Sequence, residues 1–515
     1  MPRKKAVFIG PTLASAADQI IDAQKITYNG REITTVPHTV ENVTALRRSG
    51  LDVDSPILHY YDWLGNKPFD PVQTNTAAMM VQERRAFVFN RMGTGKTRSA
   101  IFAFDYLRKE GMVHKMLVVG TLSTLARTWL RECLMVAPHY KTVNLHHSTK
   151  KGRLRALSQP HDVAVINYDG VKVLLDDLVG KYDVIVCDEA SALRNATTGR
   201  WKALHRVSSR CKYLWLMTGT PTPKAPTDGH GLLKIAYPHH PMAKSFVRFR
   251  DKIMHKITQF KWVPKDDAHE TLEEWLVPQV QYNLDDVMEL PTTAYSYEDV
   301  TLSSQQEKVY EALRQACIDR VHDIKALNAA VLLSKLVQIC SGVVLDSKGN
   351  AVKLDDPRLE VARDIVEEND RHSIIFVPFV RSANRVYEYL QAQGLDAYIV
   401  HGGISMKERN KVFARFQDRP SKWSGASVLV AQPDAMAHGL TLTEANLILW
   451  YAPITNYETY EQANARIVRP GQTSKTRIVH LRGSRAEREV YKALSTKEKN
   501  QEKLLKTLAS NVEMW

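Results

Sequence analysis

The chain has 515 residues, with 70 Lys or Arg against 56 Asp or Glu and a formal net charge of +14. Hydrophobic residues make up 44% and charged residues 24%, which is typical of globular proteins and excludes a disordered or fibrous chain. The length allows two or three domains. The five cysteines are scattered and form no CxxC pair, which argues against a disulfide framework or a zinc ribbon and favours a reducing compartment.

The sequence predicts no export signal and no membrane segment. Arg3, Lys4 and Lys5 precede a short apolar stretch, but Gly10 and Pro11 interrupt it. No apolar run approaches the roughly 18 residues that a membrane helix needs. We therefore expect a cytoplasmic monomer without a membrane partner, associated with the nucleoid or, if a phage encodes it, located in the host cytoplasm. The excess positive charge favours a polyanionic partner, with a solvated surface as the alternative.

The first 66 residues differ in composition from the rest, because they hold seven basic and seven acidic side chains and contribute nothing to the positive excess. The segment KITYNGREITTVPH (25–38) predicts two strands around the turn Asn29-Gly30. TVENVTALRRSG (39–50) predicts a capped helix that ends at Gly50. A small ββα-like module is the simplest interpretation.

From about residue 84, short apolar runs alternate with helical stretches, which is typical of parallel sheets with crossover helices. Residues 225–345 lack such runs and contain helix-like stretches, for example residues 304–339. The pattern therefore predicts two α/β lobes with a helical region between them. The runs of the first lobe are 86–90, 115–120, 163–167, 183–189 and 213–219, and those of the second are 373–379, 397–402, 427–432, 447–452 and 477–481.

NRMGTGKT (90–97) lies directly between a predicted strand and a predicted helix. Glycines at 93 and 95 allow backbone N–H groups to close around a phosphate at the amino end of the helix. Lys96 is then placed to reach the β- and γ-phosphates, and the Thr97 hydroxyl is placed to bind Mg²⁺. Asn90 stands where the general motif has its first glycine, and a plain structural turn is the alternative.

VIVCDEAS (184–191) ends an apolar run with two carboxylates, at the sheet edge where ligand sites form in parallel α/β proteins. Asp188 is a candidate ligand of Mg²⁺ through water, and Glu189 is a candidate base for the attacking water. An acidic pair after a strand is usually a helix cap. Its combination with the phosphate loop indicates a nucleoside triphosphatase.

The second lobe contains YEQANARIVRPGQ (460–472), in which Gln462, Arg466 and Arg469 are spaced to share one helix face. No acidic residue offsets the arginines between positions 466 and 472. A guanidinium that reaches a γ-phosphate accelerates its transfer greatly, so Arg466 and Arg469 are arginine-finger candidates. A solvated basic helix is the alternative.

Taken together, these segments resemble the superfamily 2 motors and, within them, the Snf2-type ATPases, especially compact bacterial or bacteriophage members. NRMGTGKT is similar to the family's MGLGKT loop and departs from it at Asn90, Arg91 and Thr94. DEASALRN (188–195) is similar to the DEAH box with Ser191 in place of histidine, and QANARIVRPGQ (462–472) resembles the family's QAxxRxxRxGQ. Further matches occur in family order at 117–129, 166–170, 216–224, 374–382, 401–409 and 437–450.

The resemblance implies two RecA-like lobes that bind ATP and Mg²⁺ between them. The expected domains are the N-terminal α+β module (1–66), lobe 1 (67–235), helical protrusions and linker (236–345), lobe 2 (346–482) and a C-terminal helical brace (483–515). Gln73 is placed like the glutamine that reads adenine. The implied catalytic residues are Lys96, Asp188, Glu189, Gln462, Arg466 and Arg469, with nucleotide contacts from Gln73, Met92, Gly93, Thr94, Gly95, Lys96, Thr97 and Gly439.

DNA contacts are implied by motif position alone, since these motors grip the phosphate backbone mainly with hydroxyls, N–H groups and a few basic side chains. A structural role is an equal alternative for each position, because Ser, Thr and Asn commonly satisfy backbone groups at strand ends. The candidates are Ser123, Thr124, Tyr168, Asn195, Arg381, Ser382, His401, Gly402 and Thr441.

The leading hypothesis is an ATP-dependent translocase on double-stranded DNA that remodels branched DNA or displaces bound proteins. A strand-separating DNA or RNA helicase is the first alternative, because the same two-lobed fold supports both activities. An ATP-switched clamp on a protein partner, which the neutral N-terminal module would bind, is the second alternative.

Overall fold

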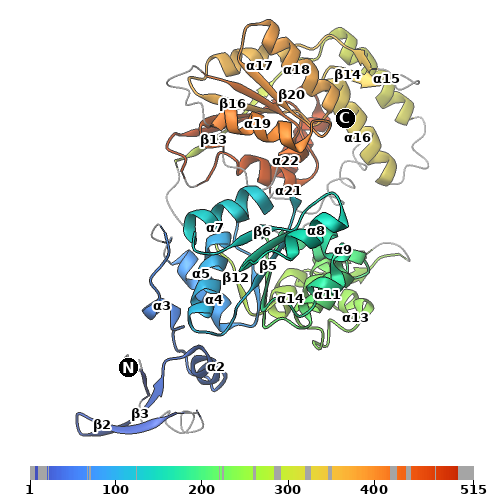
Figure 1. Cartoon of the computed structure of the whole chain (residues 1–515). Helices are drawn as coiled ribbons and strands as arrows, with labels where there is room; N and C mark the ends of the chain where they lie inside the picture. Colours follow the sequence, from blue (N-terminus) through green and yellow to red (C-terminus); the bar gives the residue numbers. More distant parts are fainter. Residues whose placement is uncertain are drawn as a thin grey trace. The chain divides into compact units, whose positions relative to one another are not determined.

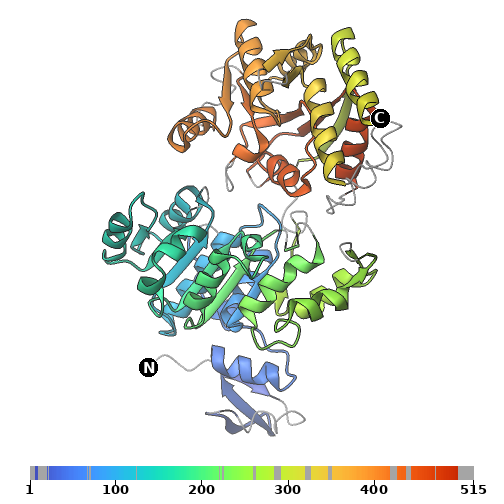
Figure 2. The same cartoon turned by 90° about the vertical axis from the view of Figure 1, so that its right-hand side faces the viewer.

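The computed structural model describes residues 6–9, 20, 22–65, 68, 71–122, 125–219, 221–222, 225–258, 262–283, 291–318, 326–345, 351–417, 426–436, 442–469 and 471–496. The chain divides into two compact units, unit 1 (1–222 and 226–287) and unit 2 (223–225 and 288–515). Each unit contains a parallel sheet with helices on both faces (Figures 1 and 2), which confirms the predicted α/β fold. Within the described residues, no helix has the length and hydropathy needed to cross a membrane.

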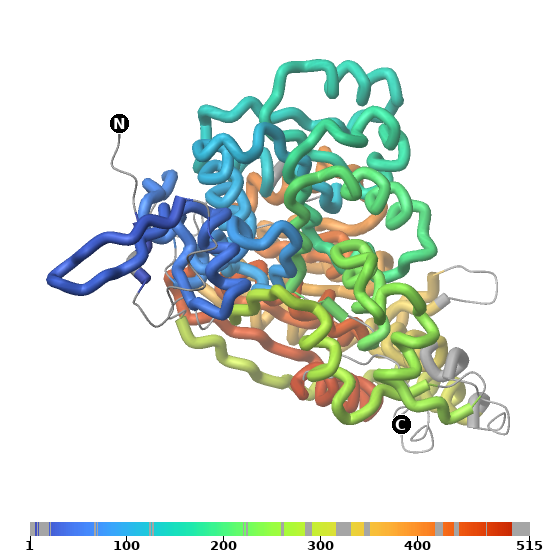
Figure 3. Tube along the Cα trace, turned by 90° about the horizontal axis from the view of Figure 1, so that it is seen from below, coloured from blue at the N-terminus to red at the C-terminus, as the bar shows by residue number. Residues whose placement is uncertain are grey.

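Unit 1 begins with a three-stranded antiparallel sheet in the order β1 (Ala6–Ile9), β3 (Arg31–Pro37) and β2 (Gln24–Tyr28), followed by α2 (Val40–Arg48). The predicted hairpin and helix are present, and β1 is an additional strand. Asn29 and Gly30 both have positive φ (50° and 75°), as a tight hairpin turn requires. Every residue of β2 is exposed, and Figure 3 shows the hairpin projecting from the rest of the unit.

The main sheet of unit 1 has seven parallel strands in the order β12-β4-β9-β8-β5-β7-β6. All five strands expected in this lobe are present, and β6 and β12 extend the sheet at its two edges. The strands are β4 (Arg85–Val88), β5 (Met116–Gly120), β6 (Thr142–Asn144), β7 (Val163–Asn167), β8 (Val184–Asp188), β9 (Tyr213–Met217) and β12 (Gln279–Val280). The helices include α3 (Ile57–Tyr60), α4 (Val72–Gln82), α5 (Lys96–Lys109), α7 (Arg131–Val136), α8 (Lys150–Leu157), α9 (Tyr168–Val173), α10 (Leu175–Leu178), α11 (Gly199–Ser208), α12 (Gly229–Ala236), α13 (Phe246–Ile253) and α14 (Ala268–Trp275).

Two separate hydrophobic cores enclose this sheet, because alternate side chains of each strand point to opposite faces. Val186 and Trp215 pack in the core that α4, α5 and α7 cover. Their neighbours Cys187 and Leu216 pack in the core that α9, α11, α12 and α14 cover. Both faces must be apolar in such a sheet, which explains why its strands read as continuous apolar runs.

The sheet of unit 2 has six parallel strands in the order β13-β20-β19-β16-β18-β17. All five strands expected in the second lobe are present. They are β16 (His372–Phe376), β17 (Ala397–Val400), β18 (Val428–Ala431), β19 (Ala445–Trp450) and β20 (Thr476–Arg482), and β13 is Thr293–Asp299. The helices include α15 (Ser304–Ile318), α16 (Ala326–Cys340), α17 (Arg358–Glu367), α18 (Val380–Ala392), α19 (Met406–Gln417), α21 (Tyr457–Asn464) and α22 (Arg485–Ser495).

The prediction that residues 225–345 lack strands was wrong. β13 is a seven-residue edge strand that pairs with β20 along its whole length. Its sequence TAYSYED is not an apolar run, because an edge strand keeps much of its surface in water. Shorter strands also lie in this region, namely β10 (Met254–Lys256), β11 (Trp262–Pro264), β12 and β14 (Val343–Leu345), the last paired with β15 (Ala351–Lys353). Its helices divide between the units, α12–α14 in unit 1 and α15–α16 in unit 2.

β13 completes a buried polar contact inside unit 2. His480 on β20 is 2% exposed, and Tyr460 on α21 contacts its Nε2 at 2.8 Å while the Ser296 carbonyl of β13 contacts its Nδ1 at 3.2 Å. Tyr297 and Tyr491 pack their rings against the imidazole. Burial is the main cause that lowers the pKa of His480 from 6.5 to about 4; the hydrogen bond to the Ser296 carbonyl opposes this shift, and the positive charge of nearby Arg482 adds to it.

We expect His480 to make unit 2 less stable in acid. The unfolded chain binds a proton at His480 below pH 6.5 and the folded unit does not, so stability falls as the pH falls, by about 1.4 kcal/mol per pH unit between pH 6.5 and 4. Hydrogen exchange of the β20 amides between pH 7.5 and 5 measures this loss for unit 2 alone. His480→Gln should flatten the slope, and an unchanged slope in that variant would contradict this assignment.

Candidate active site

The loop between β4 and α5 has the geometry of a phosphate cradle. Gly93 and Gly95 both have φ of 85°, a left-handed conformation that glycine adopts without strain. Gly95 is the N-cap of α5, so the loop N–H groups lie at the positive end of this helix dipole. A Cβ atom on Gly95 would lie 1.9 Å from Nε2 of Gln73, so only glycine fits here.

Gln73 and Lys96 hold this loop from two sides. The Gln73 side chain lies on α4, is 1% exposed, and donates a hydrogen bond to the Thr94 carbonyl at 3.3 Å. The Lys96 ammonium donates to the backbone carbonyls of Asn90 at 2.6 Å and Arg91 at 3.1 Å. The Thr94 hydroxyl donates to the Arg91 carbonyl at 2.8 Å, closing the turn. The lysine charge is thus held over the loop in which a phosphate would lie.

Asn90, which stands in the place of the motif's usual glycine, is a buried bridge between three elements. Its Nδ2 donates to the Thr76 hydroxyl on α4 at 2.8 Å, and its Oδ1 accepts from the backbone N–H of Tyr282 at 3.1 Å. The next residue continues this pairing, because the Arg91 N–H donates to the Tyr282 carbonyl at 2.8 Å. The side chain is 1% exposed. Residues after β12 therefore brace the start of the phosphate loop.

Asp188 ends β8 at the same sheet edge as the loop. In the sheet register, Asp188 and Val88 both pair with Met217 of β9, the strand between them. Two strand spacings place the start of the loop about 10 Å from Asp188. The indole N–H of buried Trp129 donates to Asp188 Oδ2 at 2.9 Å and so fixes the orientation of the carboxylate.

Glu189 follows in a strained backbone conformation, with φ of 53° in the left-handed region. Such a conformation costs a non-glycine residue of order 1–2 kcal/mol and is often found at functional sites. It turns the chain sharply at the end of β8, so that Asp188 is buried and Glu189 is partly exposed.

The residues present fit a bound Mg²⁺ by the chemistry of their donors. Thr97 is the second residue of α5, directly after the cradle, and Asp188 ends β8, which lies two strands from β4 in the sheet. A hydroxyl and a carboxylate oxygen are ligands that Mg²⁺ prefers, with phosphate and water completing its shell.

In unit 2 the expected helix face is not present. α21 ends at Asn464, so Arg466 and Arg469 lie in the turns after it and do not share a helix face with Gln462. Pro470 cannot continue a helix, and the residue before a proline is biased away from helical geometry. The Arg466 side chain is 1% exposed, and Gln462 donates to Glu458 Oε1 at 3.2 Å.

The candidate DNA contacts are placed individually within each unit. Tyr168 is buried and its hydroxyl donates to the Asp188 carbonyl at 2.9 Å, while exposed Asn195 accepts from the Thr197 N–H at 2.9 Å.

In unit 2, His401 Nδ1 accepts from the Gly403 N–H at 3.1 Å, and burial lowers the pKa of His401. Arg381 is exposed, Ser382 is buried, and the Gly402 N–H donates to Gln432. Ser123, Thr124, Thr441 and the nucleotide candidate Gly439 lie outside the described residues.

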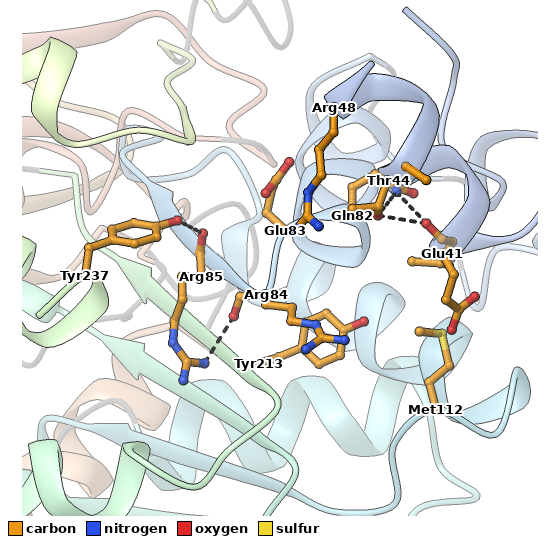
Figure 4. A pocket seen from close by; sticks show the side chains of 12 residues that line it. Glu41, Thr44, Arg48, Gln82, Glu83, Arg84, Arg85, Met112, Tyr213 and Tyr237 are labelled. Atoms are coloured by element: carbon orange, nitrogen blue, oxygen red, sulfur yellow. Dashed lines mark hydrogen bonds between the residues drawn. The ribbon is translucent and has the colours of Figure 1, made fainter. Parts of the chain in front are cut away.

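A cavity of about 410 Å³ lies at the opposite, amino-terminal edge of the sheet, where α2 meets α4, β4 and β9 (Figure 4). Gln82, near the cavity wall, donates to the Val40 carbonyl and the Thr44 hydroxyl and so fastens α2 to α4. Burial raises the pKa of Glu83 on this wall. α4 therefore contacts the N-terminal module at one end and the phosphate loop, through Gln73, at the other.

No local sequence pattern assigns a role to Trp129 or Tyr282. In the sequence, the only sign of the contact between Asn90 and Tyr282 is the asparagine at the position of the motif's first glycine. The contact itself follows no local pattern, because Tyr282 lies 192 positions away in the chain.

We expect Asn90→Ala to weaken both the fold of unit 1 and nucleotide binding. The change leaves the Tyr282 N–H without its acceptor and removes the donor to Thr76, for a loss of about 1–3 kcal/mol in the free energy of unfolding. Urea denaturation measures this loss, and the KM for ATP should rise with it. Asn144→Ala, which removes an exposed bond to the His146 N–H, is the matched control and should cost less. Equal losses in the two variants would contradict the brace.

Comparison with known proteins identifies the family. The SNF2-related domain matches residues 72–342, and the helicase conserved C-terminal domain matches residues 357–471. A Mycoplasma genitalium protein described as an uncharacterized ATP-dependent helicase is 24% identical over 82% of this chain, and a protein of Acyrthosiphon pisum secondary endosymbiont phage 1 is 24% identical over 78%. The chain spans 40% of the Mycoplasma relative and 87% of the phage relative.

A solved Sulfolobus solfataricus SWI2/SNF2 ATPase core in complex with dsDNA aligns with 88% of this chain and 97% of its own at 20% identity, with a TM-score of 0.42. The SNF2-related domain alone covers more than half of the chain. The chain therefore belongs to the SNF2-related family, whose members are ATP-dependent enzymes of helicase superfamily 2.

Proposed function

We propose that this chain is an ATP-dependent translocase on double-stranded DNA that remodels branched DNA or displaces bound proteins. Its main support is the phosphate loop and the pair Asp188-Glu189 at one sheet edge, in a chain of the SNF2-related family. A Bacillus subtilis relative, 23% identical over 76% of this chain and matched over 43% of its own length, is described as an ATP-dependent helicase/translocase.

In this proposal, unit 1 supplies the residues that bind and hydrolyse ATP. Lys96 would exchange its two loop carbonyls for the β- and γ-phosphate oxygens, a stronger interaction because both partners are charged. Mg²⁺, held by Thr97 and Asp188, would screen the negative charge of the phosphates. Glu189 would orient the attacking water and accept its proton. Arg466 and Arg469 of unit 2 are the proposed source of positive charge for the transferred phosphoryl group.

DNA is the proposed polyanion because the net charge of +14 is carried entirely by residues outside the neutral N-terminal 66. Contacts to the phosphate backbone carry little sequence information, so we expect binding that does not depend on sequence.

Lys96→Ala and Glu189→Gln should each lower ATP turnover by at least about 100-fold. Lys96→Ala should also weaken ATP binding, whereas Glu189→Gln should retain it because the shape of the side chain is kept. Fluorescent nucleotide binding and phosphate release separate the two effects. Glu132→Gln, which removes a partly buried carboxylate paired with Arg98 at 2.9 Å, is the control and should retain turnover. Near-normal turnover in Lys96→Ala and Glu189→Gln would overturn the site assignment.

ATP hydrolysis measured without nucleic acid and then with single-stranded DNA, blunt duplex and a branched junction tests the substrate. Stimulation mainly by duplex or junction DNA is the expected result. Stimulation by single strands alone, with unwinding of a forked duplex, would favour the strand-separating helicase instead. No stimulation by any nucleic acid would overturn the proposal and favour the ATP-switched clamp.

A further inference from the structure

A strongly basic surface lies on unit 1, outside the sequence segments that resemble the family motifs. Residues 133–161 contain five Lys or Arg and no Asp or Glu, in a chain with 56 acidic residues overall. This stretch forms β6, the edge strand of the sheet, and α8, which packs against β6 (Figure 1).

The basic side chains of α8 gather on its outward face. Lys150, Lys151, Leu154 and Arg155 are exposed and lie within about 140° of one another around the helix axis. Ala156 is buried against the sheet on the opposite side. α8 thus presents three cations and the apolar side chain of Leu154 to solvent as a single surface, which we call the α8 surface.

A buried arginine fixes the position of this helix. Arg153 is 9% exposed, and its Nη1 contacts Asn167 Oδ1 at 3.4 Å while its Nη2 contacts His146 Nδ1 at 3.2 Å. The Thr149 hydroxyl caps the helix by accepting from the Gly152 N–H at 3.1 Å. The α8 surface is therefore held by polar contacts and a cap, and its exposed cations are not needed for these bonds.

Several cations of unit 1 are paired with carboxylates, whereas those of the α8 surface are not. Arg98, Arg108 and Lys172 pair with Glu132, Asp162 and Asp169 at 2.8–2.9 Å. Among the described residues, no carboxylate lies within ion-pair distance of the cations of the α8 surface. Three like charges without a counter-charge repel one another, and a polyanion removes that cost.

The α8 surface is connected to the carboxyl edge of the sheet, near the candidate DNA contact Tyr168. Asn167 ends β7 and is followed by Tyr168, so Arg153 joins α8 to the carboxyl edge of the sheet where Asp188 also lies. Residues 145–149, which lead into α8, follow the carboxyl end of β6 at the same edge. Exposed His146 and His147 extend the surface toward this edge.

We propose that the α8 surface binds the phosphate backbone of duplex DNA through Lys150, Lys151 and Arg155. This inference rests on the proposed function and adds to it a contact surface on the outer edge of unit 1. The contacts involve charge and not base edges, so they hold DNA of any sequence.

The triple variant Lys150→Ala/Lys151→Ala/Arg155→Ala tests the proposal in the full-length protein. Fluorescence anisotropy with a labelled blunt duplex should show a Kd at least about tenfold higher at 50 mM salt. The slope of log affinity against log salt should decrease by up to about 2.7, because each lost phosphate contact contributes about 0.9. The DNA concentration that gives half-maximal ATPase stimulation should rise by the same factor as the Kd.

The matched control is Arg84→Ala/Lys181→Ala/Arg210→Ala, which removes three exposed cations that precede β4, β8 and β9 at the opposite edge of the sheet. It should leave the Kd within about twofold of wild type. Circular dichroism should show that both variants fold. An equal loss of DNA affinity in both variants would mean a general effect of net charge. No loss of DNA affinity in either variant would mean that the α8 surface has another partner. Each of these results overturns the proposal. If the wild type binds no duplex, the proposed function fails as well.

Discussion

Burial of both faces of the two parallel sheets is the constraint on which the other features of this protein depend. Val186 and Cys187 are adjacent in β8 and pack into different cores, so each strand must be apolar on both sides. Polar groups are then displaced to the strand ends. Asp188 and the phosphate loop occupy the same edge for this reason, since the carboxyl ends of parallel strands meet there.

The phosphate loop is held by elements that are far apart in the chain. Gln73 and Thr76 come from α4, and Tyr282 comes from the segment after β12. Buried, satisfied hydrogen bonds of this kind specify one loop conformation, because each broken bond would leave a polar group without a partner. The N-terminal module contacts the other end of α4 through Gln82, so α4 is bonded to this module at one end and to the loop between β4 and α5 at the other.

Charge is distributed unevenly over unit 1. Arg98 and Arg108 are paired with carboxylates, and the pocket at the amino-terminal edge contains both signs. α8 has only positive charge on its outward face. A single-sign surface next to the sheet edge that holds Asp188 suits the proposed binding of a polyanion, since contacts to a phosphate backbone can be exchanged without reading sequence.

The sequence by itself determined the α/β class, the ten central strands, the N-terminal hairpin and the glycine turn between β4 and α5, because apolar runs and glycine spacing are local signals. It missed β13, whose edge position needs no apolar run, and it extended the helix of Gln462 past Asn464. Only the tertiary structure decided the partners of Asn90, the bond from Trp129 to Asp188 and the burial of His480. These depend on contacts between distant segments, which no local pattern records.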